Sequence, residues 1–516
     1  MKRNKILAVT LAIALMLGVT TIAFADVPHI EGGVLGNVTP KAGVYQFEEV
    51  AWLSGEPVVL TGTLVIPTIP TTDKYNLTYT YDLANKDKKA TLSRKITYEV
   101  LKLKNESVNQ TTYKTTITKL DEVYKFGADT YTIGTYKFGK SVLEDNTPAV
   151  NYRSGSVYSQ RIFYKNGDVK TATGKVTVDT NTDVLVGYNH RWGNSETQII
   201  NEIITGEIQK ATTGTTGSTT GTTTPAVDVW KGTAQVKMSS VEKERFDYVK
   251  TDQQTISFKG NYIEIKEQEN VLQYTYDMPT VSGSTINDKI RNKNEKSIKR
   301  QAVLDSKPLI TPKLRDTTGH WAEKPILLTT SLELFSAESN FFAPDSKITR
   351  KDFFKGLVRV VADVKPLTTA ELIKRTRGVG LPLPFPDVAT DDPNISFYEF
   401  IKDNKMIIGE NEDFLGDRPI TRAEMITAII TTLGLEDMAP QPPYRTSFKD
   451  NDSIPFWSKD AIYMANEIGL VKGYADGTIK PNQLVTRAEA AALFNKLIDH
   501  IRETITEDYR DKLINR

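Results

Sequence analysis

The sequence contains no cysteine, and this absence limits how the protein can be built. Neither a disulfide framework nor thiol chemistry is available to the chain. Its stability must therefore come from the burial of apolar side chains. With 516 residues, the chain is long enough to form roughly two or three separate cores.

The chain also lacks an excess of charge of either sign. Its formal net charge is +1, which gives no reason to expect nucleic acid or a bulk anionic surface as a partner. Any recognition of anions must therefore be local.

Sequence signs of catalysis are missing as well. No Gly-x-Ser-x-Gly elbow, phosphate-binding glycine loop or EF-hand loop occurs. The histidines are scattered, without the His-x-x-x-His spacing of a metal site; they are His29, His190, His320 and His500. We therefore predict no catalytic residues, no metal and no cofactor, and the chain is not expected to be an enzyme.

A long apolar run occurs only at the N-terminus. Met1 to Lys5 is basic, Ile6 to Val19 is apolar, and Ala23-Phe24-Ala25 supplies small residues around a cleavage site. This order is typical of a secretory signal peptide. We predict a signal peptide over residues 1–25, export, and no membrane span in the mature chain.

Residues 26–210 have the pattern of an all-β domain. In segments such as Val58 to Ile66 and Tyr75 to Tyr81, threonine, tyrosine, valine and isoleucine alternate with polar residues. A period of two is typical of half-buried strands. Regular turns between short strands predict an antiparallel, sandwich-like fold, with an open barrel as the alternative.

Three segments follow this domain. Residues 211–226 form a threonine- and glycine-rich tract, which we expect to be a flexible tether. Strand patterns return over residues 227–282, either as a further β unit or as part of the first domain. Residues 283–313 are basic and have no apolar face, which predicts a solvated linker helix more than a patch for an anionic polymer.

The C-terminal part contains one motif three times, each copy placed before an apolar run. The copies begin at Ile348, Ile420 and Val485, and each continues with threonine, arginine and an acid three residues after the threonine. This pattern predicts a helix N-terminus with a capping box. The capping residues are Thr349 with Asp352, Thr421 with Glu424, and Thr486 with Glu489.

The arginine of each motif falls on the first helical residue, where an acid would be preferred. A guanidinium beside free helix amides strengthens an anion-binding position and offers a planar fork to a carboxylate. Pairing with a neighbouring carboxylate of the protein is the alternative. The arginines are Arg350, Arg422 and Arg487.

Upstream of each motif the chain repeats an aspartate, an aromatic residue that opens a helix, and a glycine-containing exit. The aspartates are Asp316, Asp387 and Asp450, and the aromatic residues include Trp321, Phe397 and Trp457. A roughly constant period of this kind marks repeated units that bury a shared core.

This C-terminal part resembles the S-layer homology (SLH) domain family, which has three tandem copies. The resemblance implies repeats at residues 314–368, 382–436 and 445–500. The residues that follow, 501–516, have the composition of a charged helical tail. The resemblance also implies an all-α, pseudo-threefold domain with grooves between its lobes. The first copy departs from the family pattern at Leu314 and Lys351-Asp352, and the second lacks the tryptophan.

The resemblance further implies non-covalent attachment to a secondary cell-wall polysaccharide, often one that carries pyruvate ketals. Arg350, Arg422 and Arg487 would then bind the carboxylates. Trp321 and Trp457 would be core or groove-wall residues able to stack on sugars. We expect a cell-surface protein, either of the S-layer or accessory to it, that is able to self-assemble. Its β region would be structural or interacting; a wall-anchored polysaccharide hydrolase is the alternative.

Overall fold

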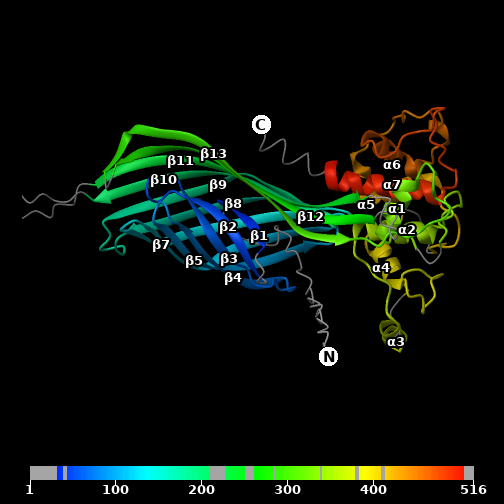
Figure 1. Ribbon diagram of the computed structural model, residues 1–516, viewed down its shortest axis with the longest axis horizontal. Coiled ribbons are helices and arrows are strands. Elements are labelled where there is room, and N and C mark those ends of the chain that lie inside the picture. Colours follow the sequence, from blue (N-terminus) through cyan, green and yellow to red (C-terminus); the bar gives the residue numbers. More distant parts are fainter. Residues whose placement is uncertain are drawn as a thin grey trace, which may run out of the picture.

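The computed structural model describes residues 32–38, 43–209, 227–249, 261–282, 285–336, 340–377, 383–407 and 413–504. A long, rolled antiparallel sheet precedes a helix-containing part, and the two lie end to end (Figure 1). The predicted signal peptide, the threonine- and glycine-rich tract and residues 505–516 of the predicted tail lie outside the described residues. No helix in the described ranges has the length and apolar character needed to cross a membrane.

Thirteen strands of the described chain form one sheet in which each strand pairs with its neighbours in sequence. They are β1 (Gly33–Val38), β2 (Val44–Ala51), β3 (Val58–Val65), β4 (Lys74–Asn85), β5 (Ala90–Asn105), β6 (Gln110–Phe126), β7 (Asp129–Asn146), β8 (Asn151–Lys165), β9 (Gly174–His190), β10 (Gly193–Gln209), β11 (Val227–Val249), β12 (Asn261–Ser282) and β13 (Thr285–Pro308).

The sheet is rolled into a half-barrel because one face of its strands is apolar. Along β4 the buried residues alternate with exposed ones, and the buried set includes Tyr79 and Tyr81. Rolling brings the first strands near the last ones, so Arg300 of β13 lies 3.0 Å from Glu48 of β2. A large core of aromatic and aliphatic side chains fills the inside.

The sandwich-like arrangement predicted for the β region is wrong. A period of two identifies strands and their buried faces, but it does not say whether two faces belong to two sheets or to one sheet that curls. Here the strands are long, up to 24 residues in β13, and the twist of one continuous sheet encloses the core.

Residues 227–282 are not a separate β unit, because β11 pairs with β10 along its length, from Gln209 with Val227 to Gly193 with Lys243. The tract at residues 211–226 therefore connects two neighbouring strands of one sheet. The basic linker predicted at residues 283–313 is mostly strand β13. Its exposed, charged residues are typical of an edge strand, where charge opposes pairing with other chains.

The helix-containing part follows directly. Its helices are α1 (Glu323–Ser331), α2 (Arg350–Val361), α3 (Thr369–Arg377), α4 (Ile395–Asp403), α5 (Arg422–Leu433), the short η2 (Glu436–Met438) and η3 (Asn451–Ser453), α6 (Phe456–Glu467), α7 (Arg487–Asp499) and η4 (His500–Thr504). We call α2, α5 and α7 the Thr-Arg helices, because each begins at the arginine of a Thr-Arg motif.

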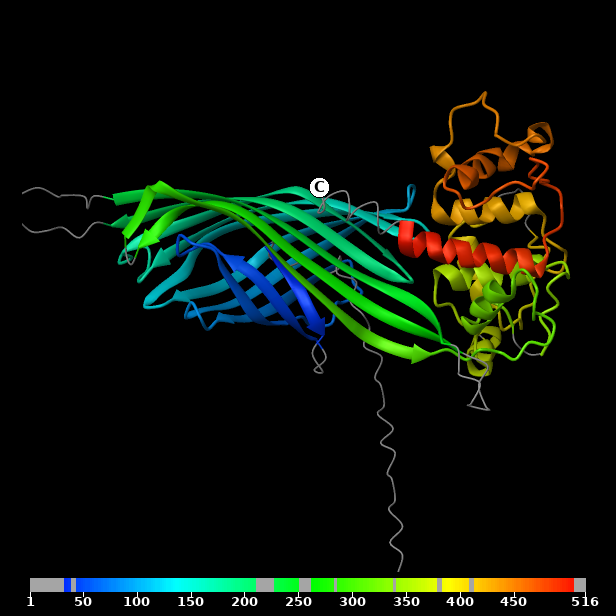
Figure 2. The ribbon, with the colours of Figure 1, turned by 45° about the horizontal axis from the view of Figure 1, so that its top comes forward.

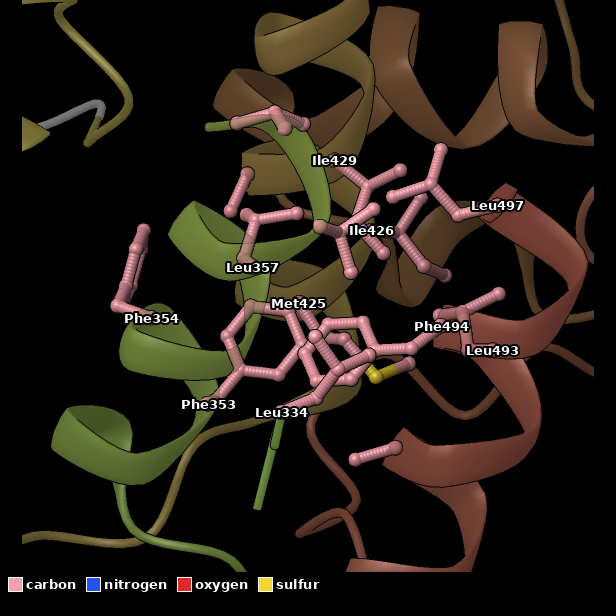
Figure 3. Packing of buried hydrophobic residues seen from close by; sticks show 14 of the residues in the cluster. Leu334, Phe353, Phe354, Leu357, Met425, Ile426, Ile429, Leu493, Phe494 and Leu497 are labelled. Atoms are coloured by element: carbon pink, nitrogen blue, oxygen red, sulfur yellow. The ribbon is translucent and has the colours of Figure 1, made fainter. Parts of the chain in front are cut away.

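The three Thr-Arg helices share one apolar core (Figure 3). Phe353 of α2, Met425 of α5 and Phe494 of α7 point toward one another, and the rings of Phe353 and Phe494 are stacked with centroids 5.3 Å apart. All three side chains are at most 1% exposed. No single helix could bury these residues alone, so the core holds the segments together.

Candidate functional site

The threonine of each motif caps its helix. The side-chain oxygens of Thr349, Thr421 and Thr486 accept from the backbone amides of the acids at distances of 3.1, 3.3 and 3.2 Å. The carboxylates of Glu424 and Glu489 in turn accept hydrogen bonds from the backbone amides of Thr421 and Thr486, which completes two capping boxes. Asp352 is one methylene shorter, and its carboxylate lies 4.0 Å from the Arg487 guanidinium.

The residues before the three threonines form a closed ring of backbone hydrogen bonds. Ile348 N–H donates to Val485 O at 3.0 Å, Val485 N–H to Ile420 O at 3.1 Å, and Ile420 N–H to Ile348 O at 3.2 Å. The starts of α2, α5 and α7 are therefore held around one point.

The upstream aspartates serve one purpose in all three copies. Each carboxylate accepts from two successive backbone amides in the turn before the next Thr-Arg motif, at 2.7 to 2.9 Å. The second residue of each amide pair has a positive φ of 52 to 55°. The pairs are Phe342 and Ala343 on Asp316, Phe414 and Leu415 on Asp387, and Ile479 and Lys480 on Asp450.

Each motif arginine reaches from its own helix start into the neighbouring copy. Arg350 Nε donates to Phe414 O at 2.9 Å, and Arg487 Nε donates to Phe342 O at 2.8 Å. Arg422 Nη2 donates to Lys472 O at 3.3 Å. The three guanidinium groups therefore lie at the boundaries between copies.

The three arginines differ in what surrounds them. Arg350 is 7% exposed, lies over the rings of Phe354 and Phe414, and is 3.4 Å from Glu424. Burial lowers its pKa. This guanidinium is largely occupied by protein groups, as the carboxylate-pairing alternative expected.

Arg487, in contrast, lines an open groove of about 610 Å³, which we call the α2 groove. The groove also has Asp352, Lys355 and Arg359 of α2 along one side. The rest of its lining comes from the end of α1 and the residues after it, from the segment between α2 and α3, and from the residues just before α4. These residues are Thr330, Glu333, Leu334, Phe335, Ser336, Pro366, Pro393 and Asn394.

Positive charge gathers in the α2 groove. Lys355, Arg359 and Arg487 contribute three cations, and Glu333 and Asp352 contribute two acids. Burial lowers the pKa of each of the three cations, so partial removal from water disfavours their charge. An anionic ligand would relieve this cost, because it would supply opposite charge within the groove.

Sequence reasoning missed Lys355 and Arg359. Both follow Asp352 on α2, at spacings of three and seven residues, and therefore lie on one face of the helix. That spacing was the available signal. Arg359 also donates to Glu333 O and lies over the ring of Phe397, which fixes its guanidinium against two other elements.

Arg422 faces a second polar cluster. Its guanidinium lies 5.0 Å from the ring centroid of Tyr474, and Lys480 Nζ lies 4.4 Å from the same ring. The Tyr474 hydroxyl donates to Glu489 at 3.2 Å, and it accepts from Gln483 Nε2 at 2.9 Å. Two cations therefore lie against one aromatic ring at the boundary between the second and third copies.

The aromatic residues at the helix starts are not equivalent. Trp321 is 65% exposed and Trp457 is 46% exposed, so of the two predicted roles, core or groove wall, the core role is wrong. Both lie outside the lining of the α2 groove, and they offer open ring surface. Phe397, their counterpart in the second copy, is fully buried beneath Arg359.

A family model described as the S-layer homology domain matches residues 313–354 and 447–491. The chain carries S-layer homology domains. The matched segments contain the first and third motifs, with Arg350 and Arg487. S-layer homology domains bind secondary cell-wall polymers, and the chain is a secreted protein associated with the cell wall at the cell surface.

Similar proteins include a "Cell surface protein" of Thermoanaerobacter kivui, 32% identical over 27% of this chain and 18% of the relative. A "Surface layer protein" of Brevibacillus choshinensis is 34% identical over 17% of this chain and 8% of its own length. "Exoglucanase XynX" of Acetivibrio thermocellus is 23% identical over 36% of this chain and 16% of its own length. The chain thus spans less than a fifth of the length of each of these relatives.

Proposed function

We propose that this protein is anchored non-covalently to a secondary cell-wall polysaccharide by three S-layer homology repeats with pseudo-threefold symmetry. The second repeat, which includes Asp387 and Arg422, lies between the two segments that match the family model. Its support is geometric, because it has the same aspartate-to-turn bonds and the same threonine helix cap as its neighbours. Its arginine also contacts a backbone carbonyl of the next copy, although through Nη2 and at a different position, Lys472.

The observation that carries the proposal is the gathering of Lys355, Arg359 and Arg487 at one groove beside a helix start. A pyruvate ketal presents a planar carboxylate on a sugar. A guanidinium can hold such a group through two parallel hydrogen bonds, and an ammonium adds a second charge. We propose this groove as the main carboxylate site.

The Arg422 cluster is proposed as a second site, with Tyr474 as the surface on which a sugar would stack. The exposed rings of Trp321 and Trp457 would give further stacking contacts. Each contact alone is modest, but two sites on one polymer gain from effective concentration. The largely enclosed Arg350 would contribute least to direct binding.

The test is retention of the full chain on purified cell walls with and without chemical removal of pyruvate. We expect Arg487→Ala to lower affinity for native walls by about tenfold, because a charged hydrogen-bonding partner is lost. Arg445→Ala is the matched control, since Arg445 pairs with Asp452 on the exposed surface of the same part of the chain. Equal retention of the wild type on both kinds of wall would reject pyruvate recognition.

For the β region we propose a structural or interacting role, including self-assembly, without catalysis. Its buried carboxylates are engaged by the sheet, as Arg94 shows by binding both Glu49 and Glu122 inside the core. Assembly is tested by light scattering of the purified chain with and without wall polymer. A concentration-independent monomer under both conditions would contradict it.

A wall-anchored polysaccharide hydrolase is the second candidate. It is favoured by relatives whose names include an exoglucanase, an amylopullulanase and an endoglucanase. Release of reducing sugar from glucan and wall substrates by the full chain would support it. If the full chain released no reducing sugar from these substrates, the hydrolase candidate would be rejected in favour of the structural or interacting role.

A further inference from the structure

The C-terminal ends of all three Thr-Arg helices meet the same end of the sheet. Backbone Ala149 N–H donates to Thr432 O at the end of α5, at 3.0 Å. Trp192 Nε1 donates to Val360 O at the end of α2, at 2.8 Å. Arg502, just beyond α7, donates through Nε to Glu244 O of β11. Figure 2 shows α7, in red, with its C-terminal end toward the sheet.

Close packing accompanies these bonds. One apolar cluster runs through the junction and includes Trp192 together with residues of all three helices. Gly434, the left-handed cap of α5, has φ of 69°, and a Cβ there would lie 2.6 Å from Thr147 Cγ2. The sheet and the helices therefore touch as closely as parts of one core.

The β9–β10 hairpin makes the most specific of these contacts. Trp192 is 1% exposed, and its ring packs edge-on against Phe246. Arg191 donates through Nη1 to Ala362 O at 3.3 Å, and its guanidinium lies 4.6 Å from the centroid of the Trp192 ring. The last carbonyls of a helix lack partners within the helix, and this hairpin supplies two donors to them.

The bonded carbonyl is next to the α2 groove. Arg359, which lines the groove, immediately precedes Val360, and Lys355 lies about one helical turn earlier. A shift of the α2 end would therefore move both cations relative to Arg487, which belongs to a different helix. The relative placement of the three charges depends on what holds that end.

We propose that Arg191 and Trp192 are positioning residues for polymer binding: the sheet clamps the C-terminal end of α2 and so fixes Lys355 and Arg359 in the groove. This inference rests on the proposed function. The half-barrel is then a part of the anchoring unit as well as the region that the anchor displays.

The experiment is a double-mutant cycle on the full chain, with binding to purified wall polymer measured by calorimetry. Trp192→Phe keeps an aromatic ring but removes the indole donor, and Arg359→Ala removes a groove cation. We expect Trp192→Phe alone to weaken binding about three- to tenfold, the equivalent of one lost hydrogen bond. In the Arg359→Ala background its effect should shrink, since the two residues act through the same groove.

Hydrogen exchange supplies the structural readout. Amides at the end of α2 should exchange faster in Trp192→Phe, while those of α5 stay as in the wild type. Arg191→Ala is the second variant if Trp192→Phe folds poorly, and it should act in the same direction. Trp230→Phe is the matched control, because Trp230 is also buried but belongs to β11 near its start, away from the junction.

The possible results separate the two proposals. If Arg359→Ala weakens binding and both hairpin variants bind like the wild type, the clamp is rejected and the anchoring site stands. The clamp would also be rejected if the losses of binding free energy in Trp192→Phe and Arg359→Ala were fully additive in the double variant. Additivity would mean that Trp192→Phe weakens binding independently of the groove, for example by destabilising the protein in general. If Arg359→Ala and Arg487→Ala both leave binding unchanged, the proposed site itself is wrong.

Discussion

The indole N–H of Trp52 donates a hydrogen bond to the carboxyl group of Glu202, 150 residues further along the chain. Trp52 follows β2 and Glu202 belongs to β10, so this bond joins early and late parts of the rolled sheet. Burial raises the pKa of Glu202 to about 7, although Arg161 and the Trp52 bond oppose the shift. The core of the half-barrel therefore contains a carboxyl group that titrates near neutrality.

This pKa predicts how stability depends on pH. The folded value is raised above the ordinary value of 4.5, so folding takes up a proton between pH 4.5 and about 7. The stabilisation is complete below pH 4.5 and is lost as pH rises toward 7, at up to about 1.4 kcal/mol per pH unit for one proton. We expect the wild type to melt at a lower temperature at pH 8 than at pH 5.

Glu202→Gln should flatten that dependence, because the amide stays neutral and its oxygen can still accept from Trp52. Thermal unfolding at pH 5, 6, 7 and 8 measures the difference. Glu207→Gln is the matched control on the same strand, since Glu207 makes a partly exposed pair with Lys175. If the melting temperature of Glu202→Gln depended on pH as steeply as that of the wild type, Glu202 would not be the group responsible. Two other buried groups shape the remaining slope: Glu244, whose pKa burial also raises to about 7, adds to it, and His190, whose pKa burial lowers to about 3, opposes it below about pH 6.5.

A second prediction concerns the buried ion network of the half-barrel. Arg94 is 2% exposed and lies 2.7 Å from Glu49 and 2.6 Å from Glu122. Burial works against ionisation of Glu122, yet Arg94 and Arg161 hold its pKa below the ordinary value. Arg94→Ala would leave two buried carboxylates without this partner and should destabilise the sheet by about 3–5 kcal/mol.

Chemical denaturation of Arg94→Ala tests this expectation, with Lys104→Ala as the control. Lys104 pairs with Asp73 on the open surface, and such pairs contribute little. If Arg94→Ala lowered the free energy of unfolding no more than Lys104→Ala does, the expectation would be wrong, because the two carboxylates would then be accommodated without Arg94.

A third prediction tests whether the second repeat is built like the others. Asp387 accepts from the amides of Phe414 and Leu415 at 2.7 and 2.8 Å, and Leu415 has φ of 54°. Asp387→Ala removes both acceptors and should destabilise the helix-containing part by about 1–3 kcal/mol. The same change at Asp316 and Asp450 should give losses of similar size, measured by thermal unfolding. If Asp387→Ala alone caused a negligible loss of stability, the second repeat would not be built like the first and the third.

The helix starts were predictable because their information is local. A threonine followed three residues later by an acid specifies a cap through side-chain chemistry alone, and Thr421 with Glu424 forms it as expected. The strands were predictable for the same reason, through their period of two.

What could not be predicted depends on contacts between distant residues. The choice between a sandwich and a rolled sheet is decided by contacts such as Arg300 with Glu48, 252 residues apart. The composition of strand β13 predicts a linker instead of a strand, because an edge strand needs no apolar face. Lys355 and Arg359 become site residues only when Arg487 of another helix is brought beside them.

The pairing of Gln209 with Val227 has a practical consequence for display. These residues lie at the end of β10 that is opposite the helix-contacting hairpin, on the order of 50 Å away along the strand. A foreign domain grafted between them would leave the hydrogen-bonding register of the sheet unchanged, since both flanking residues are already neighbours. Such a graft would be held at the tip most remote from the anchoring helices, where it would face the medium.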